Sequence, residues 1–186
     1  MTNINSAKIL ILSTNGFEQS ELEVPLKDLK AKGATVHVAT PDGNDIKGWD
    51  EKDWGGTVKA DLKLADVNVA DYDALVLPGG QMNPDILRAN ADAVALVKSF
   101  ADHGKTIAAI CHAPWLLIEA DIIKGRKATS YGSIKTDLVN AGAHWEDSEV
   151  VTDNGIITSR SPADLNAFVA KIVEEVEEGD HARRAA

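Results

Sequence analysis

The sequence predicts an α/β domain in which a doubly wound, mostly parallel sheet is sandwiched by helices. Short apolar runs recur along the chain at residues 9–12, 36–39, 74–77 and 107–110. Their apolar character is continuous rather than alternating, which is typical of strands buried on both faces. Helical patterns separate these runs, and strands that alternate with helices build a parallel sheet covered on both sides.

Two of the helical patterns end in a glycine. Leucines at helical spacing over residues 22–29 are followed by Gly33, and an apolar stripe over residues 94–101 is followed by Gly104. Glycine readily adopts the left-handed conformation that closes a helix, so each pattern predicts a helix that ends just before its glycine.

The end of the chain combines a hairpin with the clearest helix. Residues 150–152 and 156–158 flank Asp153-Asn154-Gly155, a strong signal for a tight turn between antiparallel strands. Apolar residues then recur at helical spacing over residues 165–176. Ser161 is the predicted N-cap of this helix and Pro162 lies in its predicted first turn.

Length and composition point to one domain spanning residues 1–186, with a core at about 8–176 and a polar tail at 177–186. The 29 acidic and 19 basic residues give a net charge of −10, which disfavours nucleic-acid binding. Residues 1–6 lack the layout of a secretory signal, and no apolar run approaches the roughly 18 residues of a membrane span. We therefore expect a cytoplasmic protein that binds neither membrane nor nucleic acid.

The lone cysteine is the main functional candidate. A buried run ends at Ile110, and Cys111-His112-Ala113-Pro114 follows at once. Pro114 favours the first turn of a helix, so Cys111 is predicted on a sharp strand-to-helix turn that exposes its side chain. Backbone N–H groups at the helix start would favour the reactive thiolate. The alternative is a small buried side chain, the common fate of a free cysteine.

Two backbone N–H groups could stabilise negative charge beside this cysteine. His112 provides one, in the position of the residue after a nucleophile, and Gly80 in Pro78-Gly79-Gly80 could provide the other. The imidazole of His112 is a candidate base only if the turn is tight, because neighbouring side chains usually point apart. An ordinary strand-to-loop turn is the alternative for the two glycines.

Glu21 is a candidate acid near the thiol. Pro25 cannot donate to the carbonyl of Glu21, so the helix is predicted to start just after Glu21 or to kink there. A carboxyl group held in a partly buried site would stay protonated and could donate to sulfur. Ordinary negative charge at a helix start remains the alternative for Glu18 and Glu21.

Other chemistry finds little support in the sequence. The histidines show no spacing typical of zinc sites, and one cysteine excludes a multi-cysteine metal site, so we expect neither metal nor cofactor. Trp49 and Trp54 bracket a predicted loop in which they would serve local packing or subunit contacts.

Taken together, the motifs closely resemble the ThiJ/PfpI superfamily, in the branch of PfpI-type intracellular proteases and bacterial general stress proteins. The resemblance runs from about Lys8 to Val176. The stretches that carry it are Phe17-Glu18-Gln19-Ser20-Glu21-Leu22 with Pro25, Leu77-Pro78-Gly79-Gly80, Ala109-Ile110-Cys111-His112-Ala113-Pro114, Gly125-Arg126-Lys127-Ala128-Thr129-Ser130-Tyr131, Asn140-Ala141-Gly142-Ala143 and Thr158-Ser159-Arg160-Ser161-Pro162-Ala163-Asp164-Leu165.

The resemblance implies a flavodoxin-like sandwich, similar to class I glutamine amidotransferases, with the cysteine on a strained elbow. It implies that Glu21 hydrogen-bonds the sulfur and that the amides of Gly80 and His112 form an oxyanion hole. It also implies a homo-oligomer, at least a dimer, in which Asp85 of a neighbouring chain reaches His112. Relatives carry glutamate or aspartate at that position, and the shorter aspartate reaches less far.

Two residues depart from the family pattern. Ala113 replaces the glycine usual after the Cys-His pair, and Tyr131 stands where the Parkinsonism-associated relatives have a second histidine.

Three functions remain open at this point. The first is a stress-response enzyme, a hydrolase or lyase in which Cys111 attacks carbonyl carbon. Its substrates would be peptides, as in a PfpI-type peptidase, or small carbonyl compounds, as in a glyoxalase or deglycase. The second is a redox sensor or protective protein that uses oxidation of Cys111 without turnover. The third is a chaperone or oligomeric scaffold, which no residue favours.

Overall fold

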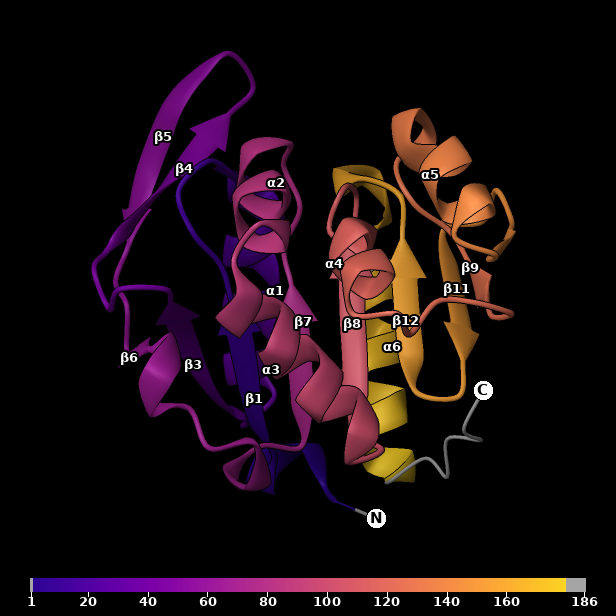
Figure 1. Cartoon of the computed structure of the whole chain (residues 1–186). Helices are drawn as coiled ribbons and strands as arrows, with labels where there is room; N and C mark the ends of the chain where they lie inside the picture. The colour runs from indigo at the N-terminus through magenta and orange to yellow at the C-terminus, as the bar shows by residue number, and fades with distance from the viewer. Residues whose placement is uncertain (1, 180–186) are drawn as a thin grey trace.

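The computed structural model describes residues 2–179, and in this part of the chain a seven-stranded sheet forms the centre of the molecule (Figure 1). Its strands, in order across the sheet, are β11 (Val150–Asp153), β12 (Ile156–Ser159), β8 (Thr106–Ile110), β7 (Ala74–Leu77), β1 (Lys8–Leu12), β3 (Thr35–Thr40) and β6 (Leu62–Lys63). Within this sheet, only the pairing of β11 with β12 is antiparallel. The predicted flavodoxin-like α/β fold is confirmed.

Helices cover both faces of the sheet (Figure 1). α1 (Gln19–Ala31) and α6 (Leu165–Glu178) contact each other on one face. α2 (Met82–Arg88), α3 (Ala91–Asp102) and α4 (Pro114–Glu119) lie on the other face. The remaining helices are α5 (Lys135–Asn140) and the short 3-10 turns η1 (Ile4–Ser6), η2 (Leu64–Asp66), η3 (Val69–Asp71), η4 (Gly132–Ile134) and η5 (Pro162–Asp164).

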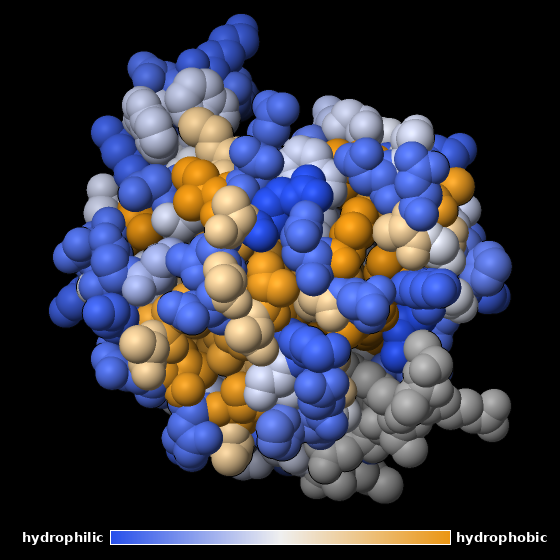
Figure 2. Space-filling view, in the orientation of Figure 1, coloured by the Kyte–Doolittle hydropathy of each residue, from blue (hydrophilic) through white to orange (hydrophobic). Residues whose placement is uncertain are grey.

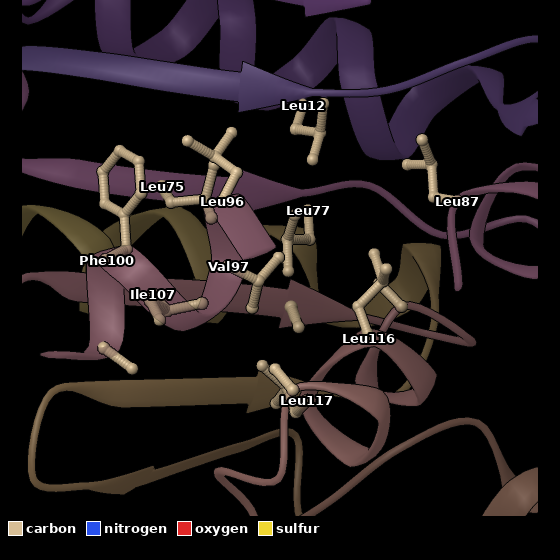
Figure 3. Packing of buried hydrophobic residues seen from close by; sticks show 14 of the residues in the cluster. Leu12, Leu75, Leu77, Leu87, Leu96, Val97, Phe100, Ile107, Leu116 and Leu117 are labelled. Carbon is tan, nitrogen blue, oxygen red and sulfur yellow. The ribbon is translucent and has the colours of Figure 1, made fainter. Parts of the chain in front are cut away.

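The core has two layers because successive strand residues point to opposite faces. Leu75 and Leu77 pack with Phe100 beneath α3 and α4 (Figure 3), whereas Val76 packs with Phe168 beneath α1 and α6. This two-sided burial explains the continuous apolar runs in the sequence.

Apolar side chains are largely withdrawn from the surface. Figure 2 shows hydrophilic residues over much of the face that carries α2, α3 and α4, with apolar residues between them. The exposed large apolar side chains come from separate elements: Trp54, Ile86, Tyr131 and Val139. Within residues 2–179, no helix is long and apolar enough to cross a bilayer.

Smaller sheets extend the domain. β9 (Lys127–Ala128) pairs with β10 (His144–Trp145), and β2 (Phe17–Glu18) pairs with β4 (Ile46–Asp50), which pairs with β5 (Asp53–Val58). The prediction of a loop from Trp49 to Trp54 is therefore wrong. The two tryptophans form a cross-strand pair with ring centroids 5.6 Å apart, which stabilises a hairpin where a turn of two residues suffices.

The ends of two helices also differ from the prediction. α1 begins at Gln19 rather than after Glu21, because Glu18 caps it: Glu18 Oε2 accepts from the backbone N–H of Glu21 at 2.8 Å. Ser161 is not the N-cap of α6 but precedes the 3-10 turn η5, and its side chain makes no capping hydrogen bond.

The C-terminal segment lies partly outside the described residues. The predicted polar tail starts inside α6, which continues to Glu178. Residues 180–186 lie outside the described part of the chain.

The predicted hairpin and helix stops are confirmed. Asn154 and Gly155 both have positive φ, 48° and 75°, as the turn between β11 and β12 requires. Gly33 and Gly104 adopt φ of 97° and 69° just beyond α1 and α3.

Candidate active site

The carboxyl ends of β1, β7 and β8 meet at one edge of the sheet, the upper edge in Figure 1. The chain leaves β1 for β3 on one side and later returns to β7 on the other, so the switch point of the sheet lies between β1 and β7. In open α/β sheets, sites form beyond the strand ends at this point. The segments that follow these three strands carry Glu21, Gly80 and Cys111, which were predicted to lie near one another.

Cys111 occupies a strained backbone conformation directly after β8. Its φ is 65°, in the left-handed region, where a residue other than glycine costs about 1–3 kcal/mol. Two hydrogen bonds hold it there: its N–H donates to the carbonyl of Ser159 at 3.0 Å, and its carbonyl accepts from the N–H of Tyr131 at 2.9 Å. The predicted elbow is present, and its neighbours on both sides fix it.

The elbow brings the thiol and the adjacent imidazole together. Cys111 Sγ lies 3.1 Å from His112 Nδ1. Side chains of neighbouring residues usually diverge, and the left-handed turn at Cys111 removes that divergence. Burial lowers the pKa of His112 below its ordinary value, so the imidazole is neutral at pH 7 and its unprotonated nitrogen can accept a proton.

The thiol is not exposed, contrary to the prediction. Cys111 is only 6% exposed, because the strand end at Gly79 packs directly against it. This burial, and secondarily the charge of Glu21, raises the pKa of the Cys111 thiol above its ordinary value. The backbone N–H groups of Gly80 and His112 act in the opposite direction and favour the thiolate. Their role as an oxyanion hole for a substrate stays a prediction.

Glu21 is fully buried beside the sulfur. Its Oε2 accepts from the backbone N–H of Gly80 at 3.2 Å, and its carboxyl also interacts with the Cys111 side chain. Burial, and secondarily the charge of Glu18, raises the pKa of Glu21 to about 8. At pH 7 the carboxyl is therefore mostly protonated and adds no negative charge against a thiolate.

The loop after β7 needs its glycines. A Cβ on Gly79 would lie 2.3 Å from Glu21 Oε2 and 2.5 Å from Cys111 Cβ, so only glycine lets the acid and the thiol approach this strand end. Gly80 has a φ of 78°, in the left-handed region that glycine adopts without strain.

Asn83 connects two of the strand ends and was missed in the sequence. It is fully buried, donates to the carbonyls of Pro78 and Gly79 at 2.8 and 3.2 Å, and accepts from the N–H of Thr14 at 2.8 Å. Asn83 lies two residues before Asp85, but a buried amide cannot be distinguished from an ordinary helix-start residue by its type alone.

His112 is enclosed by groups that come later in the chain. The Tyr131 ring stacks on the imidazole at 4.8 Å and 25°, and the Trp115 ring meets it edge-on at 5.2 Å. Nε2 lies 3.1 Å from the Oγ of Ser133. Ser133 has no local motif that would have revealed it, because it comes 21 residues after the histidine and meets it only in the fold.

Asp85 is placed differently from the other candidate residues. It is exposed in the first turn of α2, and within the chain the partner of His112 Nε2 is Ser133. One chain thus brings Cys111, His112, Glu21 and Gly80 together. The contribution of Asp85 from a neighbouring chain stays a prediction.

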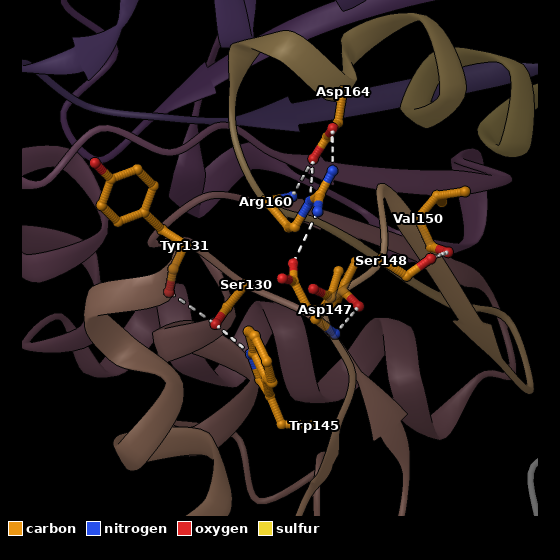
Figure 4. Close-up of polar contacts among 10 residues, drawn as sticks. Ser130, Tyr131, Trp145, Asp147, Ser148, Val150, Arg160 and Asp164 are labelled. Atoms are coloured by element: carbon orange, nitrogen blue, oxygen red, sulfur yellow. Dashed lines mark hydrogen bonds and ion pairs between the residues drawn. The ribbon is translucent and has the colours of Figure 1, made fainter.

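An ion-pair cluster anchors the strand end that supports the elbow (Figure 4). Arg160 follows Ser159, the acceptor of the Cys111 N–H, and its guanidinium bridges Asp147 at 2.8 Å and Asp164 at 2.9 Å. Asp164 is 4% exposed, whereas water reaches the Arg160 side of the pair.

A second small network, also in Figure 4, fixes the segment that carries Tyr131. Trp145 Nε1 donates to Ser130 Oγ at 3.0 Å, and that hydroxyl donates to the carbonyl of Tyr131 at 3.0 Å. The partner of the Cys111 carbonyl is therefore itself held in place. Among residues 2–179, no group of three or more histidine, cysteine or acidic residues could hold a metal ion.

Comparison with known proteins agrees with this geometry. Residues 7–175 match the model of the DJ-1/PfpI family. The chain belongs to this family. The resemblance to the ThiJ/PfpI superfamily stated from the motifs is thereby confirmed.

The relatives include proteins named deglycase, putative cysteine protease and general stress protein. Deglycase TK1284 from Thermococcus kodakarensis is 46% identical over 90% of this chain and 98% of its own length. General stress protein 18 from Bacillus subtilis is 43% identical over 87% of this chain and 92% of its own. Among solved structures, Drosophila melanogaster DJ-1beta superposes with a TM-score of 0.82 at 32% identity, covering 93% of this chain and 95% of that one.

The close packing at Gly79 can be tested by a substitution that adds a single methyl group. Gly79→Ala places a Cβ where Glu21 and Cys111 leave no room, so we expect a loss of about 1–3 kcal/mol in unfolding free energy and slower alkylation of Cys111. Gly132→Ala is the matched control, because its Cβ would meet nothing within 4 Å. Urea unfolding and iodoacetamide labelling measure both effects. Equal behaviour of the two variants would contradict the packing.

The buried acid predicts how stability depends on pH. With a folded pKa of about 8 against an ordinary value of 4.5, the folded chain holds a proton that the unfolded chain loses between these pH values. Unfolding free energy should therefore fall as pH rises through this window, by at most about 1.4 kcal/mol per pH unit. Glu21→Gln should remove this slope, measured by urea unfolding at several pH values. Glu23→Gln, on the same helix but not buried, should keep it, and a slope that survives in Glu21→Gln refutes the assignment.

Proposed function

We propose that this chain is a cysteine-dependent hydrolase of the deglycase type, which attacks carbonyl carbon in small substrates as part of a stress response. The observation that carries the proposal is the 3.1 Å approach of Cys111 Sγ to a neutral His112 imidazole on a strained elbow. Relatives named for deglycase activity and for general stress support the choice of reaction and of setting.

The proposed first step moves one proton and forms one bond. The thiol proton passes from Cys111 Sγ to His112 Nδ1, and an electron pair of the sulfur attacks the carbonyl carbon. The carbonyl π electrons move to oxygen, and the resulting oxyanion lies near the backbone N–H groups of Gly80 and His112. The imidazolium later returns its proton to the departing group. A base is needed because burial disfavours the free thiolate.

Glu21 contributes by staying neutral in this proposal. A carboxylate in contact with the sulfur would oppose the thiolate, whereas a carboxylic acid with a pKa of about 8 does not at pH 7. The acid can also donate its proton in a hydrogen bond that strengthens as negative charge develops.

The enclosure of the sulfur supports a small substrate. Cys111 is 6% and His112 8% exposed, with the rings of Tyr131 and Trp115 against the imidazole. A compact aldehyde such as methylglyoxal, or a slender glycated side chain, can approach this sulfur. A folded polypeptide would meet the surrounding rings first.

We further propose that the active unit is a homo-oligomer in which Asp85 of a neighbouring copy approaches His112. Asp85 is exposed, lies on the same helix as the half-exposed Ile86, and so can meet another chain. A carboxylate there would favour the imidazolium that forms when the thiol loses its proton.

Turnover tests the proposed reaction directly. The wild type should consume methylglyoxal and release amines from methylglyoxal adducts of lysine and arginine, followed by colorimetry and chromatography. Cys111→Ala should lower the rate by about a thousandfold or more, because it removes the attacking atom. Val139→Ala on an exposed face of α5 is the control and should keep full activity. Turnover that is absent, or that survives in Cys111→Ala, would refute the hydrolase.

A redox role is the second candidate, and one observation favours it. Glu21 Oε1 is buried and has no hydrogen-bond partner among the described residues, while Oε2 accepts from Gly80. At pH 7 the carboxyl proton can therefore lie on Oε1 with no strong acceptor near it. An oxygen added to Cys111 Sγ by peroxide would provide that acceptor.

Treatment with mild peroxide distinguishes the redox role from catalysis. Mass spectrometry should show Cys111 oxidised to a stable sulfinic acid in the wild type, and less of it in Glu21→Ala, which removes the donor. Glu23→Ala should match the wild type, since that side chain lies elsewhere on α1. An unmodified Cys111, at peroxide doses that oxidise a model thiol peptide, would remove the redox role.

A further inference from the structure

His112 needs a particular tautomer for the role proposed above. To take the thiol proton, Nδ1 must be unprotonated, which places the ring hydrogen of the neutral imidazole on Nε2. In the opposite tautomer, an N–H would point at Sγ and no proton could be accepted. The 3.1 Å contact between Sγ and Nδ1 is therefore productive in only one of the two forms.

The ring contacts of His112 do not choose between these forms. Tyr131 stacks on the imidazole at 4.8 Å and Trp115 meets it edge-on at 5.2 Å, so both fix the plane of the ring. Aromatic contacts of this kind hardly distinguish the two nitrogens. The tautomer must be set by a group that hydrogen-bonds the nitrogen remote from the sulfur.

We infer that Ser133 is a positioning residue for His112, whose hydroxyl accepts the Nε2–H and holds the imidazole in the form that can accept the thiol proton. The geometric basis is the 3.1 Å separation of His112 Nε2 and Ser133 Oγ. Ser133 lies in η4, which begins directly after Tyr131. The N–H of Tyr131 donates to the Cys111 carbonyl. The short segment from Tyr131 to Ser133 thus holds the elbow, fixes the plane of the imidazole and selects its tautomer. The inference rests on the proposed role of His112 as the base.

The same contact stabilises the product of proton transfer. Once Nδ1 takes the proton from Sγ, the imidazolium has two N–H groups, one directed at the sulfur and one at Ser133 Oγ. A hydroxyl oxygen that accepts from a cation makes a stronger hydrogen bond than one that accepts from a neutral ring. The Ser133 hydroxyl keeps its own proton, which it can donate to a carboxylate such as Asp85 of a neighbouring copy. Aspartate is shorter than glutamate, and the Ser133 hydroxyl would bridge the remaining distance between Asp85 and His112.

Ser133→Ala tests the inference in the full chain, with Ser133→Thr as the variant that keeps a hydroxyl. We expect ¹⁵N NMR of the His112 side chain to show less of the Nε2–H form in Ser133→Ala. Iodoacetamide alkylation of Cys111 at pH 7 should slow by about three- to tenfold in this variant, the worth of one lost hydrogen bond. Ser133→Thr should restore both signals. Because Ser133 is exposed, thermal unfolding should not change in either variant.

The outcomes separate the inference from the proposed function. If the tautomer and the alkylation rate of Ser133→Ala equal those of the wild type, Ser133 does not position the histidine. If both respond to Ser133 while the wild type turns over no substrate, the hydrolase is refuted and the positioning role stands. If turnover depends on Cys111 but neither signal responds to Ser133, the function stands and the inference is overturned.

Discussion

The left-handed backbone at Cys111 is the constraint on which the site depends. With φ at 65°, the residue turns its side chain toward that of its neighbour, so that sulfur and imidazole lie 3.1 Å apart. This conformation is unfavourable by itself and persists because Ser159 and Tyr131 bond the peptide groups of Cys111 on both sides. Strand β12, the ion pairs of Arg160 and the segment before η4 therefore all act on one residue.

Burial then determines the chemistry that this turn can perform. A thiol and a carboxyl group that share a nearly water-free site cannot both be charged at low cost, and burial raises the pKa of each. Glu21 takes the neutral form at pH 7, and His112, with its pKa lowered, is neutral as well. The thiol, the carboxyl group and the imidazole are thus all neutral at rest, and in the proposed reaction charge separates when the thiol proton moves to Nδ1. A desolvated site strengthens every hydrogen bond to the charges that then appear.

Residues that act through local sequence could be predicted, and residues that act through tertiary contact could not. The elbow followed from a buried run, a lone Cys111 and Pro114, and the glycines after α1 and α3 marked their helix ends. The burial of the sulfur was not visible, because it depends on the close approach of Gly79 across the sheet. Asn83 and Ser133 were missed for the same reason, since Asn83 contacts Thr14 and Ser133 contacts His112, both far away in the sequence. The hairpin of Trp49 and Trp54 was missed because cross-strand ring contact, not turn chemistry, identifies it.

The packing of the core also explains how the fold tolerates a buried acid. Keeping Glu21 at 0% exposure lowers stability above its ordinary pKa, and a glutamine, which does not ionise, would avoid that cost. The packing around it compensates through continuous apolar strands beneath helices on both faces. Selection for folding alone favours removing such a group. Its presence beside the one thiol, with the glycine that makes room for it, therefore fits the proposed reaction better than a purely structural role.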